Sequence, residues 1–142
     1  MKQVIFLCLI AFSSYGQFTG QRDYLVIQGG HETTNATIAT ALTYTLPANG
    51  VYAVTVEMLA KDATSGASIR GTKTTTFERV AGTTTQVATS LTDLLVTLVS
   101  DVANNAGAVW TIDNSGDAIR VRVTGNLTRT IHWQPKITII QL

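Results

Sequence analysis

The stretch that decides the fold is residues 109–133, VWTIDNSGDAIRVRVTGNLTRTIHW. Its middle segment alternates between apolar and charged or polar residues, the period of two that a half-buried strand shows. One predicted face carries Ile119, Val121 and Val123, and the opposite face carries Arg120, Arg122 and Thr124. Gly116 and Gly125 stand where the chain must reverse, and glycine tolerates the positive φ of tight hairpins. The pattern therefore predicts a meander of antiparallel strands that continues to residue 140.

Large side chains in alternating positions identify the predicted core. A buried tryptophan removes about 150–250 Å² from water, which makes the two tryptophans the main anchors. The segment Val51 to Lys61 is the clearest single strand, because its apolar residues fall on one face. The predicted core anchors are Trp110, Trp133, Tyr52, Val54, Val56, Val121 and Val123. Exposed aromatic residues could instead stack on a sugar, but their inward alternation favours the core.

Length and charge limit the classes of function. The chain has 142 residues, enough for one domain with its own core. Ten basic and nine acidic residues nearly cancel, so no electrostatic footprint for nucleic acid or an anionic membrane follows. Cys8 is the single cysteine, and it lies in the apolar N-terminal run. The folded part therefore has no internal disulfide and no thiolate chemistry.

Residues 1–16 have the layout of a secretory signal peptide. Lys2 precedes the apolar run Val4 to Phe12, and small polar residues follow before Gln17. The run is too short for stable membrane insertion as a helix. The ending Tyr15-Gly16-Gln17 resembles leaders of the Bacteroidota, whose mature chains often begin at glutamine. The alternative is that the run remains as an ordered apolar arm. We expect an entry segment over 17–35 and a sandwich domain over 36–142.

The rest of the chain predicts strands and turns. Residues 36–46 alternate with Ile38, Leu42, Tyr44 and Leu46 inward, and Pro47 to Gly50 predicts a hairpin turn to strand 51–61. Residues 68–80 have no strongly apolar face, which indicates an edge or an intersubunit surface. Residues 94–102 favour a strand over a helix because of their β-branched residues. About eight strands predict a single-domain, all-β protein, an antiparallel β-sandwich of jelly-roll type.

No residues form a catalytic, cofactor-binding or metal-binding motif. His31, Glu32 and His132 lack close ligand spacing, so they are interpreted as plain loop and strand residues, with His132 exposed. Asp113 to Asp117 offers clustered oxygens for calcium, but a hairpin turn is favoured. No G-x-S-x-G elbow is present. We expect no enzyme and no cofactor.

Polar residues on strand faces are the candidate interface. Threonines alternate along one predicted strand, and arginines form a basic stripe on the solvent face of the meander. The candidate interface residues are Thr72, Thr74, Thr76, Arg120, Arg122 and Arg129.

Several short segments together resemble a known family. They are Tyr52–Val56, Ile69–Gly71, Arg79–Gly82, Val109–Ile112, Ile119–Gly125 and Thr130–Trp133. From about residue 42 to 142 the chain is similar to small β-sandwich domains, often C-terminal, of bacteriophage tail, fibre and head-fibre proteins. The resemblance implies a non-enzymatic virion module that forms a homo-oligomer, commonly a trimer. Such a module contacts another virion protein, a host receptor or a host glycan.

The N-terminal leader departs from this family pattern, because phage structural proteins assemble in the cytoplasm and need no export. The alternative hypothesis is therefore a secreted or cell-surface binding or adhesion module of a Bacteroidota-like bacterium, extracellular after signal cleavage. The two hypotheses predict different N-termini, Met1 and Gln17.

Overall fold

The computed structural model describes residues 24–87, 98–99 and 107–142, and these form ten strands. None of these described residues forms a helix that could cross a membrane. The strands are β1 (Tyr24–Gln28), β2 (His31–Thr33), β3 (Ile38–Thr45), β4 (Gly50–Asp62), β5 (Ser68–Val80), β6 (Thr83–Gln86), β7 (Leu98–Val99), β8 (Val109–Ser115), β9 (Ala118–Thr124) and β10 (Ile131–Gln141).

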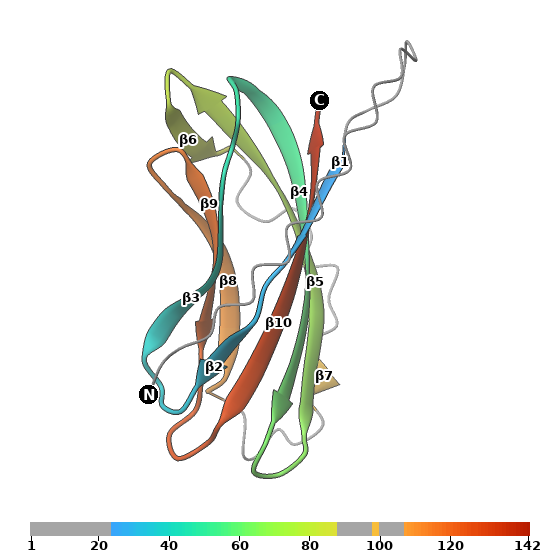
Figure 1. Ribbon diagram of the computed structural model, residues 1–142, viewed down its shortest axis with the longest axis vertical. Helices are drawn as coiled ribbons and strands as arrows, with labels where there is room; N and C mark the ends of the chain where they lie inside the picture. Colours follow the sequence, from blue (N-terminus) through green and yellow to red (C-terminus); the bar gives the residue numbers. More distant parts are fainter. Residues whose placement is uncertain (1–23, 88–97, 100–106) are drawn as a thin grey trace.

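The strands form two antiparallel sheets that pack face to face (Figure 1). The large sheet has the order β1-β10-β4-β5-β6, with β2 also paired to β10 and β7 to β5. The small sheet has the order β3-β9-β8. This arrangement confirms the predicted all-β antiparallel sandwich.

The core lies between the sheets, and both layers supply it. The two tryptophans come from different sheets, because Trp110 lies in β8 and Trp133 in β10. Each is almost fully enclosed, at 3% and 0% exposed. All seven predicted core anchors are buried: Trp110, Trp133, Tyr52, Val54, Val56, Val121 and Val123. At about 25 cal/mol per Å², burial of such side chains is the main stabilising contribution to the fold.

The two longest strands, β4 and β5, form a hairpin of 13 residues each. Asp62 accepts hydrogen bonds from the backbone amides of Thr64 and Ser65, at 2.7 and 3.3 Å, and from the Ser65 hydroxyl at 2.7 Å. Gly66 follows with φ of 76°, a conformation that favours glycine. These local contacts make residues 62–67 the turn, so β4 pairs with the strand that follows it.

Two predicted strand pairings are wrong. The segments 36–46 and 51–61 do not form a hairpin, because β3 lies in the small sheet and β4 in the large one. The meander also ends after β9, since residues 125–130 carry the chain across to β10 in the other sheet. In both places the connection passes from one layer to the other. Only β8 and β9 form the predicted hairpin, with Gly116 at φ 59° in its turn.

The inward positions of β3 were partly mispredicted because of a β-bulge. Ile38 is 55% exposed, whereas Leu42 and Leu46 are buried. The register of β3 against β9 shifts between Thr40 and Leu42. Since side chains alternate with a period of two, one extra residue moves the following residues to the other face. The even positions therefore point outward before the bulge and inward after it.

Two further expectations need correction. Strand β5 lies beside β4 along its length, and β6 and β7 cover only its two ends, so among the described residues it is an edge only in its middle. Pro135 departs from the general expectation that a proline in a sheet lies at an edge or a bulge, because it lies within β10 in the interior of the large sheet. The missing N–H of Pro135 removes no hydrogen bond between strands, because the proline nitrogen faces the break between β1 and β2. At this break the Gly29 amide donates to the Pro135 carbonyl oxygen at 2.9 Å.

Some predictions concern residues outside the described part. These predictions are the signal peptide over residues 1–16 and most of the strand over residues 94–102. Of that strand, the structure describes β7, which pairs with Ile69 and Arg70 of β5.

Candidate binding surface

The outer face of the large sheet spans four aligned strands, β1, β10, β4 and β5. Antiparallel register sets its outward side chains in rows across four strands. One row is Gln28, Lys136, Glu57 and Thr72; the next is Val26, Thr138, Thr55 and Thr74; the third is Tyr24, Ile140, Ala53 and Thr76. The three threonines predicted at an interface therefore each end one row, along β5.

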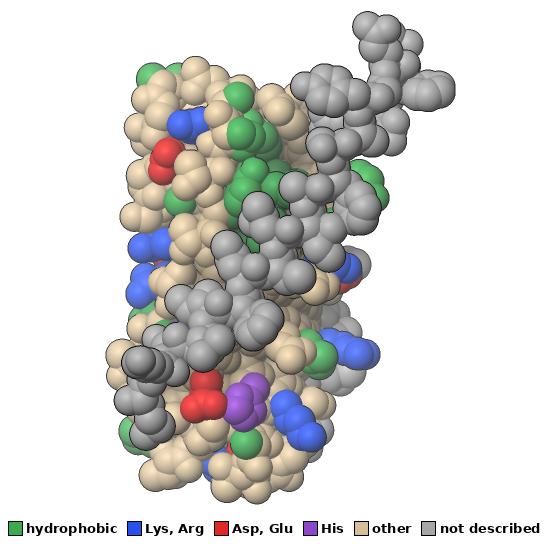
Figure 2. All heavy atoms as spheres, viewed as in Figure 1, with side chains coloured by type: hydrophobic (Ala, Val, Ile, Leu, Met, Phe, Trp, Pro, Cys, Tyr) green, Lys and Arg blue, Asp and Glu red, His purple; other side chains and the backbone are tan. Residues whose placement is uncertain are grey.

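The chemistry of this face changes along the strands. Apolar side chains occupy the end at Tyr24, which is 68% exposed, and threonines fill the centre. Charged residues occupy the other end, where Lys136 Nζ lies 2.7 Å from Glu57 Oε2. Figure 2 shows the largest patch of hydrophobic side chains in the upper half of the view, and a histidine with acidic and basic side chains beside it near the lower end. The face thus offers an apolar, a hydroxyl-rich and a charged zone in sequence.

A shallow groove of about 650 Å³ crosses the charged zone. Its outward-facing lining residues are Gln28, Glu57, Leu59, Arg70, Thr72, Gln134 and Lys136. No described acidic residue pairs with Arg70, whereas Lys136 is already bound to Glu57. Amide, hydroxyl and guanidinium groups suit hydrogen bonding to a polar partner. The groove is open and carries no described constellation of nucleophile and base.

Beside the groove, the structure brings together two residues that are far apart in the sequence. Strand β2 pairs with β10, which sets Glu32 opposite His132. His132 Nδ1 lies 3.3 Å from Glu32 Oε2, and both side chains are about half exposed. His31 pairs in register with Trp133 and therefore points to the other side. The described residues contain no group of three or more His, Cys, Asp or Glu that could hold a metal ion.

The predicted basic stripe on the small sheet divides into two different sites. Arg120 binds both carboxylate oxygens of Asp113, at 2.8 and 2.9 Å, and Arg122 lies 3.4 Å from the same carboxylate. Arg129 is not on this face: its guanidinium lies 3.3 Å from the buried carboxylate of Asp62. Because Asp113 is already engaged by arginines, the turn at 113–117 is a hairpin whose carboxylate is neutralised.

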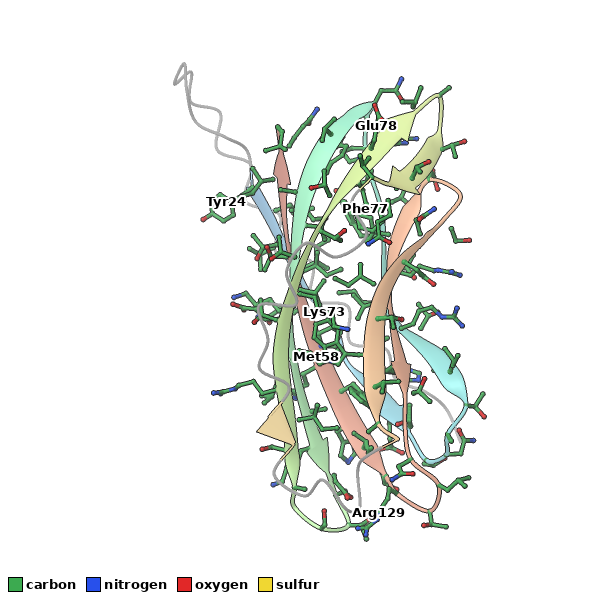
Figure 3. The ribbon with its side chains drawn as sticks, turned by 180° about the vertical axis from the view of Figure 1, so that it is seen from behind. Tyr24, Met58, Lys73, Phe77, Glu78 and Arg129 are labelled. Carbon is green, nitrogen blue, oxygen red and sulfur yellow. The ribbon has the colours of Figure 1, made fainter. Side chains whose placement is uncertain are left out.

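A third site, in which a lysine spans the two layers, has no counterpart among the predictions from sequence. Lys73 occupies an inward position of β5, and Figure 3 shows it between the sheets. Its Nζ donates to the Trp110 carbonyl oxygen at 2.9 Å and lies 4.6 Å from the centroid of the indole ring. A cation over an aromatic face stabilises such packing. In sequence, Lys73 is simply one polar residue in a run of threonines, so only the structure reveals its role.

Fold and surface together define a small antiparallel β-sandwich with one broad outer face that is apolar at one end and polar over the rest. No protein-family model matches the chain, and no curated protein matches it. Among solved structures, it is similar to the crystal structure of the Acinetobacter baumannii phage AM24 tailspike protein, with 13% sequence identity and a TM-score of 0.45. The match covers 84% of this chain and 26% of the tailspike chain.

Proposed function

We propose that the chain is a structural or attachment module of a bacteriophage particle that works through contact rather than catalysis. One observation carries the proposal: the outer face of the large sheet extends over four strands in regular rows, with threonine hydroxyls at its centre, amides and charges at one end and apolar side chains at the other. A surface of this kind suits a polar partner such as another virion protein or a host glycan. The resemblance to phage fibre and head-fibre domains supports the same proposal.

Rigid elements support the contact surface. Thr55 and Thr74 hydroxyls lie 3.0 Å apart across β4 and β5, so neighbouring strands are linked on the face itself. Beneath them, Val54 and Val56 are fully buried. A surface held in this way loses little conformational entropy when it binds.

A matched pair of variants tests which face makes the contact. Thr74→Arg places a long charged side chain in the centre of the outer face of the large sheet, and Thr111→Arg places the same side chain on the small sheet. Both positions are exposed strand residues. We expect Thr74→Arg to reduce the number of copies per purified particle at least tenfold, measured by quantitative mass spectrometry, and Thr111→Arg to leave it unchanged. Absence of the wild-type chain from particles would contradict the proposal.

The second candidate function is a secreted or cell-surface binding module, and the leader-like sequence of residues 1–16 favours it. Intact mass and N-terminal sequencing of the natural protein separate the two candidates. A chain that begins at Gln17 indicates export and favours the secreted module. A chain that begins at Met1 inside a particle favours the virion module.

A further inference from the structure

Strand β1 is an exposed apolar edge of the large sheet. It pairs with β10 on one side, and no strand among residues 24–87, 98–99 and 107–142 pairs with it on the other. Three consecutive large residues are exposed: Tyr24 at 68%, Leu25 at 37% and Val26 at 41%. Figure 3 shows Tyr24 pointing away from both sheets. An open apolar edge is a template for pairing with another strand.

Three other edges of the described sheets, those at β3, at the middle of β5 and at β8, carry features that disfavour such pairing. Strand β3 contains a bulge, and the middle of β5 carries the inward-pointing charge of Lys73. Strand β8 carries the polar side chains of Asp113 and Asn114. It is also tied to β6, since Asn114 donates to the Thr84 carbonyl at 2.7 Å and Thr84 donates to the Gly116 carbonyl at 2.8 Å.

Strand β1 has none of these features. Its sequence, YLVIQ, contains no charged residue and no proline, and its register against β10 is unbroken. Native proteins commonly protect exposed edges with such devices, so an edge without them is one that a partner covers.

The hydrogen bonds of β1 determine which of its backbone groups face the open side. Gly29 N donates to Pro135 O at 2.9 Å, in the same register that pairs Leu25 with Ile139 and Ile27 with Ile137. In an antiparallel pair, hydrogen-bonded residues alternate with residues whose backbone groups point to the other side. The N–H and C=O groups of Tyr24, Val26 and Gln28 therefore point toward the open edge.

We propose that β1 pairs with β1 of a second copy of the chain, antiparallel, about a two-fold axis at Val26. This register sets Val26 opposite the partner's Val26 and Tyr24 opposite the partner's Gln28. Tyr24, Val26 and Gln28, whose backbone groups point toward the open edge, then all form hydrogen-bonded pairs with the partner strand. The two large sheets become one continuous sheet. The contact is isologous, as in most homodimers.

A second copy fits this edge better than an unrelated strand, because β1 is complementary to itself. The strand has five residues, and the backbone groups that point toward the open edge belong to its first, middle and last residues. The symmetric register therefore gives a hydrogen-bonding partner to each of these backbone groups. The strand contains no charge, so the two-fold axis brings no like charges together. Leu25 lies beside the partner's Ile27 on the inner side, where Ile27 already packs against the core. Pairing thus sets the exposed apolar side chains of β1 beside those of the partner strand. The inference does not rest on the proposed function.

The test is sedimentation equilibrium of the full chain at micromolar concentration, for the wild type and for variants at the axis. Val26→Lys and Val26→Glu each set two like charges opposite one another, and we expect each to sediment as one copy while the wild type sediments as two. An equimolar mixture of the two variants is expected to return to the mass of two copies. The introduced lysine then faces the glutamate introduced in the other copy, and this contact requires the two positions 26 to lie close together, as the proposed register places them.

Thr138→Lys is the matched control, since Thr138 is the neighbour of Val26 on β10, on the same outer face but one strand inside the edge. We expect it to keep the wild-type mass. A wild-type chain of one copy would overturn the proposal. The proposal would also be overturned if Val26→Lys had the same mass as the wild type, whether that mass is a dimer or a trimer. A mixture of the two variants that sediments as one copy would overturn it as well. A variant that is monomeric only because it misfolds would not return to the mass of two copies in the mixture. Misfolding therefore cannot imitate the expected result.

Discussion

Asp62 is the one charged residue that is buried among the described residues, at 1% exposed. Burial alone would raise the pKa of its carboxyl group. The Ser65 hydroxyl, the Thr64 and Ser65 amides and the Arg129 guanidinium oppose this effect, and the pKa is lowered below its ordinary value of 3.8. The carboxylate therefore joins the β4–β5 turn to the β9–β10 connection, which holds Arg129.

Replacing Asp62 by Asn should destabilise the protein by about 1–3 kcal/mol at pH 7, because an amide nitrogen cannot accept from Ser65 or pair with Arg129. A group whose pKa is lowered in the folded state stabilises above its unfolded pKa, and this contribution is lost as the pH falls through the folded value. The difference between wild type and Asp62→Asn, measured by urea unfolding, should therefore shrink below about pH 4.

The control for this prediction is Asp117→Asn, since Asp117 is 45% exposed and lies 3.7 Å from Arg79. An exposed ion pair of this kind contributes little, so we expect a change within about 0.5 kcal/mol. Equal effects of the two substitutions would show that burial of Asp62 does not set its contribution.

At the scale of elements, the connection from β2 to β3 packs against Gly125, the residue that follows β9. A Cβ atom on Gly125 would overlap the Thr33 hydroxyl and lie 2.5 Å from the Asn35 carbonyl oxygen. This glycine is thus required for close approach, not for the positive φ that the sequence suggested; the positive φ of the β8–β9 turn belongs to Gly116. The close approach seats the short strand β2 at the margin of both sheets.

Gly125→Ala should therefore lower stability by about 1–3 kcal/mol, the usual cost of overpacking a site that cannot relax. Gly30→Ala is the matched control, because the nearest atom to its Cβ would be the Trp133 carbonyl oxygen at 3.9 Å. Thermal unfolding of both variants measures the difference. A Gly125→Ala variant as stable as the Gly30→Ala variant would mean that the β2–β3 connection moves away without loss.

Individual strands of this fold could be predicted from the sequence, since alternation of apolar residues places Tyr52, Val54 and Val56 on one face without any tertiary information. The bulge in β3 could not be predicted, because residues 38–42 have the same alternating pattern with or without an extra residue. Of the candidate surface, the threonines of β5 were identified by their lack of an apolar face. Lys136, Glu57 and Gln28, which complete the row of Thr72, come from three strands whose order no local pattern reveals.

At the scale of the whole molecule, the sequence does not specify which layer each strand joins. The turn after Leu46 and the turn at Asp62 both contain small and polar residues, yet the first crosses between layers and the second closes a hairpin. The difference lies in long-range contacts, such as the pairing of β4 with β10, which is 69 or more residues away in sequence for every pair in its register. Such contacts form only when the two layers pack on one core, so the layers should unfold together.

The two tryptophans allow this cooperativity to be measured, because each reports on one sheet. Trp110→Phe leaves Trp133 of the large sheet as the sole indole, and Trp133→Phe leaves Trp110 of the small sheet. If both layers share one core, fluorescence and circular dichroism should give the same urea midpoint within each variant.

Trp133→Phe should be the less stable variant by about 1–3 kcal/mol, since Trp133 Nε1 donates at 2.8 Å to the buried Thr33 hydroxyl. Trp110 Nε1 has no hydrogen-bond partner in the described part of the chain. With a urea dependence of about 1–3 kcal/mol per molar, the two midpoints should differ by about 1 M. Separate fluorescence and dichroism midpoints within one variant would show instead that one sheet survives without the other.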